Sequence, residues 1–208
     1  MVILYLISFG VLWKLYTGYS KYVGLYLSVL TFFIVTLLPL VHGYKTPYII
    51  KCHLIILLSF CIFIGILYDC TRKLINPSLT WLLRINIGVL FFSIDDWIIQ
   101  GLLLFSAITT PYVSAKDKGI QLRSSFINKD VWVVVTGIIL LIYYNTHVSF
   151  LINNSFPLVL FAILIPTLFH FINNKYLESR VMLLCLCMIF EAFKTDQNIL
   201  KLITENIK

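Results

Sequence analysis

The sequence predicts an all-α, polytopic integral membrane protein with eight short transmembrane helices and a C-terminal amphipathic helix. Hydrophobic residues make up 60% of the 208 residues and charged residues only 12%, and the mean hydropathy is +0.95. A soluble domain of this size could not bury so much apolar surface, whereas a lipid bilayer covers it. The apolar stretches lack the alternation of barrel strands, so helices are the structure expected in hydrocarbon.

Eight apolar stretches are the candidate membrane spans, and together they form a single transmembrane domain over residues 1–193. In chain order they are Met1–Trp13, Tyr22–Val41, Pro47–Tyr68, Ser78–Ile94, Trp97–Val113, Val131–Ile152, Phe156–Ile172 and Leu177–Phe193. Several are shorter than the roughly 20 residues that a helix needs to cross hydrocarbon, so flanking residues must complete them. The first stretch has neither a positive leader nor a small-residue cleavage site, so we expect a membrane helix rather than a signal peptide.

The number of helices depends on whether residues 78–113 cross the membrane twice or once. Two crossings place Asp95 and Asp96 at a tight turn, whereas one helix across this region would bury both carboxylates at a cost of several kcal/mol. With Arg84 set aside, the Lys and Arg residues divide ten to five between the two sides for two crossings, and eight to seven for one. The positive-inside rule favours the larger asymmetry. We therefore expect eight helices, with seven as the alternative.

The basic residues are expected at helix ends, where they set orientation. The net charge is +7, and the partners it predicts are membrane lipids, whose anionic headgroups contact the basic loops. We expect no nucleic-acid binding. The basic loops then face the cytoplasm or the equivalent side of an organelle, and Asp95 and Asp96 face the other side. The sequence leaves open whether the membrane is a bacterial inner membrane, an organellar membrane or an endomembrane.

Residues 194–208 form a tail with a different pattern. Ile199, Leu202, Ile203 and Ile207 fall on one helical stripe, with polar residues opposite. This pattern predicts a short amphipathic helix lying on the membrane surface. A helix that docks on a partner protein would show the same pattern and stays open as the alternative.

Five residues are candidates for a substrate path. Arg84 lies well inside a predicted span, so it either reaches back to the headgroups or acts as an intramembrane cation. Asp95 and Asp96 either solvate a turn or mark the mouth of a cation pathway. Glu191, near the end of the last span, reaches the interface or pairs with a basic residue of another helix. Pro166 is expected to bend its helix, as in many transporter binding sites.

No metal or cofactor is expected. The four histidines, His42, His53, His147 and His170, show no spacing that places two of them on one helix face as metal ligands. A haem or metal between facing helices would need two histidines at equal depth, for which His53 and His170 are the candidates. The five cysteines include no C-x-x-C pair, and we interpret them as small packing residues.

The sequence favours transport or permeation of a small solute or ion. The first alternative is a structural or assembly subunit of a larger complex, with other membrane subunits as partners. The second is a membrane-embedded enzyme that uses the histidines and acids as acid–base groups on a lipid-linked substrate. The scarcity of buried charge argues against proton-coupled pumping and weakens the enzyme alternative. Catalytic motifs such as G-x-S-x-G and H-E-x-x-H are missing as well.

Overall fold

The protein is mainly α-helical. A computed structural model describes residues 2–42, 46–116, 119–147 and 156–206. The elements are α1 (Val2–Gly18), α2 (Tyr22–His42), α3 (Thr46–Leu67), α4 (Asp69–Gly88), the 3-10 helix η1 (Val89–Ser93), α5 (Trp97–Ile108), β1 (Tyr112–Lys116), β2 (Gly119–Arg123), α6 (Lys129–His147), α7 (Phe156–Asn173) and α8 (Tyr176–Asn206). Each of the eight predicted stretches overlaps one α-helix, so the helical prediction is confirmed.

The chain reverses direction where the two aspartates were predicted to make a turn. Helix α4 continues directly into η1, which ends at Ser93, and α5 begins at Trp97. The Asp96 carboxylate caps α5 by accepting hydrogen bonds from the backbone N–H groups of Ile98 at 2.9 Å and Ile99 at 3.3 Å. Aspartate is among the best N-cap residues because its oxygen satisfies N–H groups that have no helical partner. The region therefore forms two helices rather than one.

Within the described residues, two helical segments are long and apolar enough to cross a membrane, Ile49–Leu67 and Asp69–Ser93. Four other apolar helices are shorter: Ile3–Gly18, Tyr22–Leu37, Trp97–Ile108 and Leu160–Asn173. Core helices of soluble proteins also satisfy this criterion of length and composition. Eight membrane spans therefore stay a prediction.

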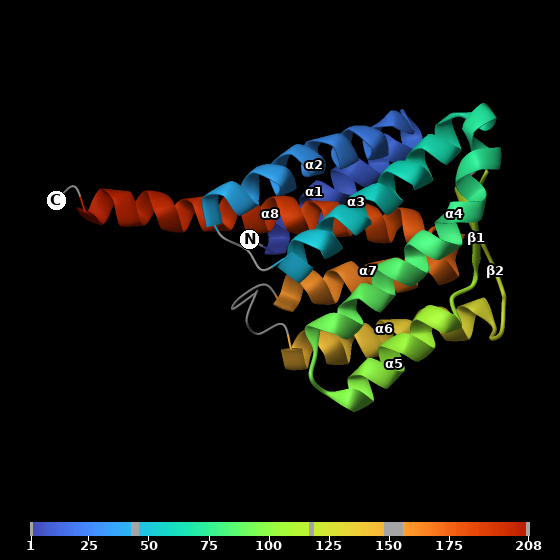
Figure 1. Ribbon diagram of the computed structural model, residues 1–208. Coiled ribbons are helices and arrows are strands. Elements are labelled where there is room, and N and C mark those ends of the chain that lie inside the picture. The colour runs from blue at the N-terminus through green and yellow to red at the C-terminus, as the bar shows by residue number, and fades with distance from the viewer. Residues whose placement is uncertain (1, 43–45, 117–118, 148–155, 207–208) are drawn as a thin grey trace.

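Six of the helices form a closed ring. Neighbouring pairs follow the order α3, α4, α5, α6, α7, α8 and back to α3. Helices α1 and α2 pack outside this ring, against α3, α7 and α8 (Figure 1). Within the described part of the chain, helices on opposite sides of the ring are not extensively packed against each other. We call the space enclosed by these six helices the interior of the ring.

The polar segment after α5 folds as a β-hairpin, which the sequence analysis missed. Strands β1 and β2 pair antiparallel, with Lys116 opposite Gly119. The side-chain amide of Asn76 in α4 pairs with the backbone of Ala115 in β1. Its Oδ1 accepts from Ala115 N at 2.8 Å, and its Nδ2 donates to Ala115 O at 3.3 Å. Thr80, one turn later, accepts from Val113 N at 2.9 Å. The hairpin is thereby fixed along the first half of α4.

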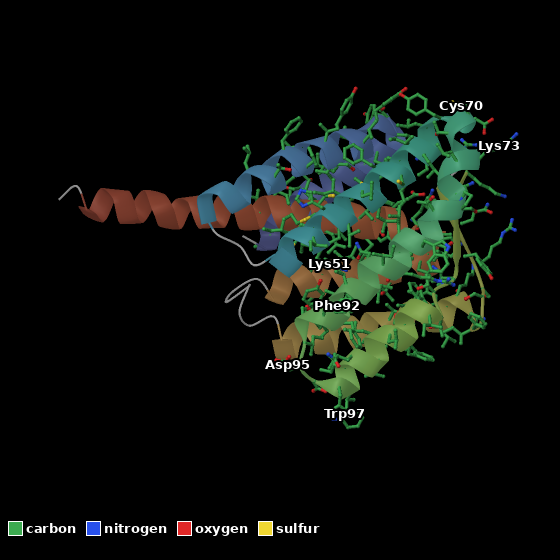
Figure 2. All side chains as sticks on the ribbon, viewed as in Figure 1. Lys51, Cys70, Lys73, Phe92, Asp95 and Trp97 are labelled. Atoms are coloured by element: carbon green, nitrogen blue, oxygen red, sulfur yellow. The ribbon has the colours of Figure 1, made fainter. Side chains whose placement is uncertain are left out.

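The hairpin marks one end of the bundle, which we call the hairpin end. The start of α4, the start of α6, the start of α8 and the end of α1 meet there, and the turn at Asp95 lies at the opposite end (Figures 1 and 2). The basic segments that two crossings assign to one side are those at the hairpin end. They include the start of α4 with Arg72 and Lys73, the end of β1 with Lys116, and Lys175 before α8.

The predicted tail is a continuation of α8. This helix extends from Tyr176 to Asn206 without a break and projects beyond the other helices (Figure 1). The apolar stripe from Ile199 to Ile207 lies outside the described side chains. Its placement on a membrane surface stays a prediction, but the tail is not a separate helix.

Small hydroxyl residues connect neighbouring helices. The hydroxyls of Ser28 in α2 and Ser59 in α3 lie 2.6 Å apart, as do those of Ser106 in α5 and Thr136 in α6. Trp132 is 1% exposed and donates from Nε1 to Ser106 O at 2.9 Å. Small residues and interhelical hydrogen bonds of this kind hold helices together where lipid provides no hydrophobic driving force.

Candidate functional site

The structure does not bring together the four predicted path residues whose side chains it describes. The Arg84 guanidinium lies over the Trp81 ring, 4.9 Å from its centroid. Trp81 is 62% exposed, whereas the Nε of Arg84 is buried without a hydrogen-bond partner. Both predicted roles of Arg84, reaching the headgroups and acting as an intramembrane cation, therefore stay predictions. Asp95 is exposed at the turn (Figure 2), and Asp96 is an N-cap. These two aspartates do not face Arg84.

The other two path candidates lie in different helices. Pro166 is inside α7, which continues through it. The next residue, Thr167, donates its hydroxyl to Ile163 O at 2.9 Å and so adds a bond in the turn where proline has no N–H. Glu191 belongs to α8, but its side chain lies outside the described residues.

The predicted histidine pair does not form a metal site. His53 in α3 contacts Ile49 O through Nδ1 at 2.8 Å, whereas His170 in α7 contacts Asp130. Helices α3 and α7 are not neighbours in the ring. Among the residues that the structure describes, no group of three His, Cys, Asp or Glu side chains could hold a metal ion.

Lys51 is the most unusual residue of the interior. It is 9% exposed and comes from the second turn of α3 (Figure 2). Its ammonium donates to both the backbone and the side-chain oxygen of Asn86 in α4. Asn86 is 6% exposed, and its Nδ2 has no partner. A buried cation without a carboxylate is costly because desolvation is not compensated.

Arg180 brings a second positive charge into the ring. It lies in the second turn of α8, donates to the hydroxyl of Tyr176, and has its Cζ 5.6 Å from the Tyr176 ring. Its charge repels that of Lys51 and also acts on Tyr144 of α6. These two effects place the charge of Arg180 near both α3 and α6, although its side chain is only partly buried. No carboxylate forms an ion pair with Lys51 or Arg180 in the described residues.

Sequence reasoning missed both of these cations. Lys51 lies inside the predicted span Pro47–Tyr68, and Arg180 lies inside Leu177–Phe193. They were counted with the loops because each is near the end of its span. The available signal was their position within the apolar stretch, the same signal that singled out Arg84. We call Lys51, Asn86 and Arg180 the interior cation site.

A buried carboxylate holds the hairpin end together. Glu178 is 0% exposed. It accepts hydrogen bonds from the hydroxyl of Tyr16 in α1 at 2.9 Å, from Ile120 N in β2 at 2.7 Å and from Lys175 Nζ at 3.0 Å. One carboxylate therefore connects α1, the hairpin and α8, and its charge is compensated by three donors.

Two neighbours adapt to this carboxylate. Gly119 has a φ of +127°, and a Cβ there would collide with Glu178 and Lys175, so only glycine fits this turn. Lys21, between α1 and α2, has its ammonium 4.2 Å from the Tyr16 ring centroid. Partial burial lowers the pKa of Lys21, the nearby Lys175 adds to this effect, and Glu178 opposes it.

A second polar pair lies at the same end. His170 Nε2 is 2.7 Å from Asp130 Oδ1, and the two side chains are 2% and 48% exposed. His170 Nδ1 is buried without a partner. The pair therefore joins a solvent-accessible carboxylate to an imidazole in the interior.

The start of α4 carries the third polar group. Arg72 donates to the carbonyls of Gly65 at 2.6 Å and Ile66 at 3.2 Å, which end α3, and pairs with Asp69 at 2.9 Å. Asp69 is 90% exposed. Arginine thus satisfies the last carbonyls of one helix and orients the first carboxylate of the next.

Fold and sites define a mainly α-helical bundle with an interior cation site and a polar hairpin end. Comparison with known protein families, curated proteins and solved structures finds no match to the chain.

Proposed function

We propose that the chain is an integral membrane protein that transports a small anionic solute. The apolar outer surface supports membrane integration: Ile3, Phe33, Phe92 and Ile172 are between 60% and 80% exposed on different helices. An exposed apolar surface of this extent needs lipid or a partner to cover it. The alternating helix directions also place the predicted basic loops together at the hairpin end (Figure 1).

The interior cation site is the observation that carries the transport proposal. Lys51 and Arg180 come from α3 and α8, which are neighbours in the helix ring. The charge of Arg180 acts on Lys51, and no carboxylate among the described residues forms an ion pair with either side chain. An anion between them would offset part of the cost of burying two like charges. The unpartnered Asn86 Nδ2 adds a neutral donor to the same site. The proposed solute therefore carries negative charge, and the basic hairpin end raises its local concentration.

Uptake measurements test this proposal. The full chain is reconstituted in liposomes, and uptake of radiolabelled inorganic phosphate, sulfate and acetate is measured. We expect at least one of these anions to be taken up above the background of liposomes without protein. Lys51→Met removes the charge with similar volume, and we expect it to lower that uptake at least tenfold. Lys73→Gln removes an exposed cation (Figure 2) and should retain most of it. Equal uptake by the Lys51→Met variant and the unchanged protein would contradict an anion site at Lys51.

One observation favours a membrane-embedded enzyme as the second candidate. Asp69, Glu178 and the Asp130–His170 pair occupy the hairpin end, around a hairpin that Asn76 holds against α4. Lipid-processing active sites gather titratable groups at one depth in this way. In this candidate the exposed Asp69, oriented by Arg72, would act as the general acid or base on a substrate held in the headgroup layer.

The two candidates predict different variants to fail. An enzyme predicts that Asp69→Asn removes a lipid-linked product from membranes while anion uptake is unchanged. The transport proposal predicts no change in membrane lipid or protein products with this variant. Mass spectrometry of membranes that contain either form distinguishes the two results.

A further inference from the structure

We propose that Tyr22, Tyr26 and Tyr68 form an aromatic site for a quaternary ammonium group, and that its ligand is the choline headgroup of phosphatidylcholine. We call these three residues the tyrosine site. The inference rests on the membrane integration proposed above and is independent of anion transport. Tyrosines are common at membrane interfaces, so the argument depends on how these three are arranged.

The tyrosine site lies where α2 begins and α3 ends. Tyr22 is the first residue of α2, Tyr26 follows one turn later, and Tyr68 comes directly after α3. Residues four apart share one face of a helix, so Tyr22 and Tyr26 lie on the same face of α2. The end of α3 touches the hairpin, because a Cβ at Gly65 would meet the Cβ of Ala115 at 2.7 Å. The site is therefore at the hairpin end, which in a membrane-spanning bundle lies among the lipid headgroups.

The three rings form a corner. The ring centroid of Tyr22 is 6.3 Å from that of Tyr26, with 30° between the planes, and 6.5 Å from that of Tyr68, with 75° between the planes. The Tyr68 hydroxyl interacts with the hydroxyls of both other tyrosines. A cation is attracted to an aromatic face from within about 6 Å of the ring centroid. The separations between the rings allow one cation to lie within that range of all three.

The rings of the tyrosine site are accessible to a ligand. Tyr22 and Tyr68 are each 41% exposed, and Tyr26 is 68% exposed. Two other tyrosines of the bundle, Tyr16 and Tyr176, are almost completely buried, and each already has a cation of the chain over its ring. Among the side chains that the structure describes, no lysine or arginine lies over a ring of the tyrosine site. Its ring faces are therefore open to an external cation.

The kind of cation follows from the groups around the site. Asp69, the residue after Tyr68, is 90% exposed although it pairs with Arg72 at 2.9 Å. A primary ammonium has three N–H donors that need acceptors, whereas a trimethylammonium group has none and binds to aromatic faces. Three rings next to one exposed carboxylate therefore suit a choline group better than an ethanolamine group. Phosphatidylcholine presents choline at the depth where the site lies.

Native mass spectrometry of the full chain tests the headgroup preference, because it counts bound lipids one at a time. The chain is purified in a maltoside detergent and mixed with phosphatidylcholine or phosphatidylethanolamine that have identical acyl chains. We expect the first phosphatidylcholine to bind about tenfold more tightly than the first phosphatidylethanolamine.

Three variants show whether the rings cause this preference. Tyr68→Leu should abolish it, and Tyr68→Phe, which keeps the aromatic face, should retain most of it. Tyr112→Leu removes an exposed tyrosine of β1 and should leave the preference unchanged. Equal binding of the two lipids by the unchanged protein, or a preference that survives in Tyr68→Leu, would overturn the proposal.

A soluble competitor identifies the recognised group. Tetramethylammonium chloride should displace phosphatidylcholine from the unchanged protein, whereas ammonium chloride at the same concentration should not. Tyr26→Leu changes the most exposed ring of the site and should narrow the difference between the two salts. Equal displacement by both salts would contradict recognition of the quaternary ammonium group.

Anion uptake separates this proposal from the transport function. In liposomes without phosphatidylcholine, we expect Tyr68→Leu to keep the uptake of the unchanged protein. A choline preference in a protein that takes up no anion would support the tyrosine site and contradict transport. Anion uptake without a choline preference would contradict the tyrosine site and support transport.

Discussion

Replacing Glu178 with alanine is expected to lower the free energy of unfolding by about 3 to 5 kcal/mol. The variant leaves the hydroxyl of Tyr16 and the N–H of Ile120 without their shared acceptor in a buried site, and it removes the carboxylate that pairs with Lys175. A buried donor that loses its partner costs the full desolvation of that group. The hairpin would also lose its link to α1 and α8. Thermal unfolding of the purified full chain in mild detergent measures the change.

Two further variants identify the cause of that effect. Glu178→Gln keeps the volume and an acceptor oxygen but removes the charge that Lys175 requires, so we expect an intermediate loss. Asp95→Ala removes an exposed carboxylate (Figure 2) and should change the stability by less than about 0.5 kcal/mol. An unfolding temperature of Glu178→Ala equal to that of Asp95→Ala would show that Glu178 does not anchor the hairpin end.

Gly24→Ala is expected to destabilise the protein by about 1 to 3 kcal/mol. A Cβ at this position of α2 would overlap three atoms of the Phe63 ring in α3. Phe63 is 0% exposed and packs edge-on against Tyr16 at 5.5 Å, so the ring has no free space to move into. Helices α2 and α3 would have to separate. The same thermal unfolding assay measures this change.

The controls for Gly24 come from the same chain. Gly10 has nothing within 4 Å of the position that a Cβ would take, so Gly10→Ala should be neutral or slightly stabilising because alanine favours helix. Phe63→Leu alone should destabilise, but combined with Gly24→Ala it should recover part of the loss, since a smaller side chain leaves room for the methyl group. Strictly additive losses in the double variant would show that the two positions are not in contact.

The helix positions could be predicted from the sequence because they follow from the lengths of the apolar stretches and from the charged and polar residues that end them. The turn at Asp95 and Asp96 is the clearest case: two adjacent charges cannot sit in the middle of an apolar helix, and Asp96 is in fact a cap. The hairpin at residues 112–123 was missed because its short strands alternate only weakly, with Val113 and Ala115 buried on one face. Its stability comes from Asn76, far away in the chain, which no local pattern reveals.

The candidate site was predicted less well than the fold. Arg84 attracted attention because it is deep within a span, yet it lies over the exposed Trp81. Lys51 and Arg180 were assigned to loops, but Lys51 is buried against Asn86 and Arg180 is partly buried beside Tyr176. The direction of a side chain around a helix decides between these outcomes, and it depends on which helices are neighbours. His170 was named only as a haem or metal candidate, because its partner Asp130 is 40 residues away.

Labelling of single cysteines in sealed vesicles tests most directly whether the bundle crosses a membrane. In a variant whose five native cysteines are replaced, Lys73→Cys places a thiol in the first turns of α4 and Asp95→Cys places one just after η1, which continues α4. Both positions are exposed in the structure (Figure 2). We predict that a membrane-impermeant maleimide added to one face modifies only the thiol at position 73, and that the same reagent on the other face modifies only the thiol at position 95. Modification of both positions from the same face of intact vesicles would contradict a membrane crossing by α4 and the transport function built on it.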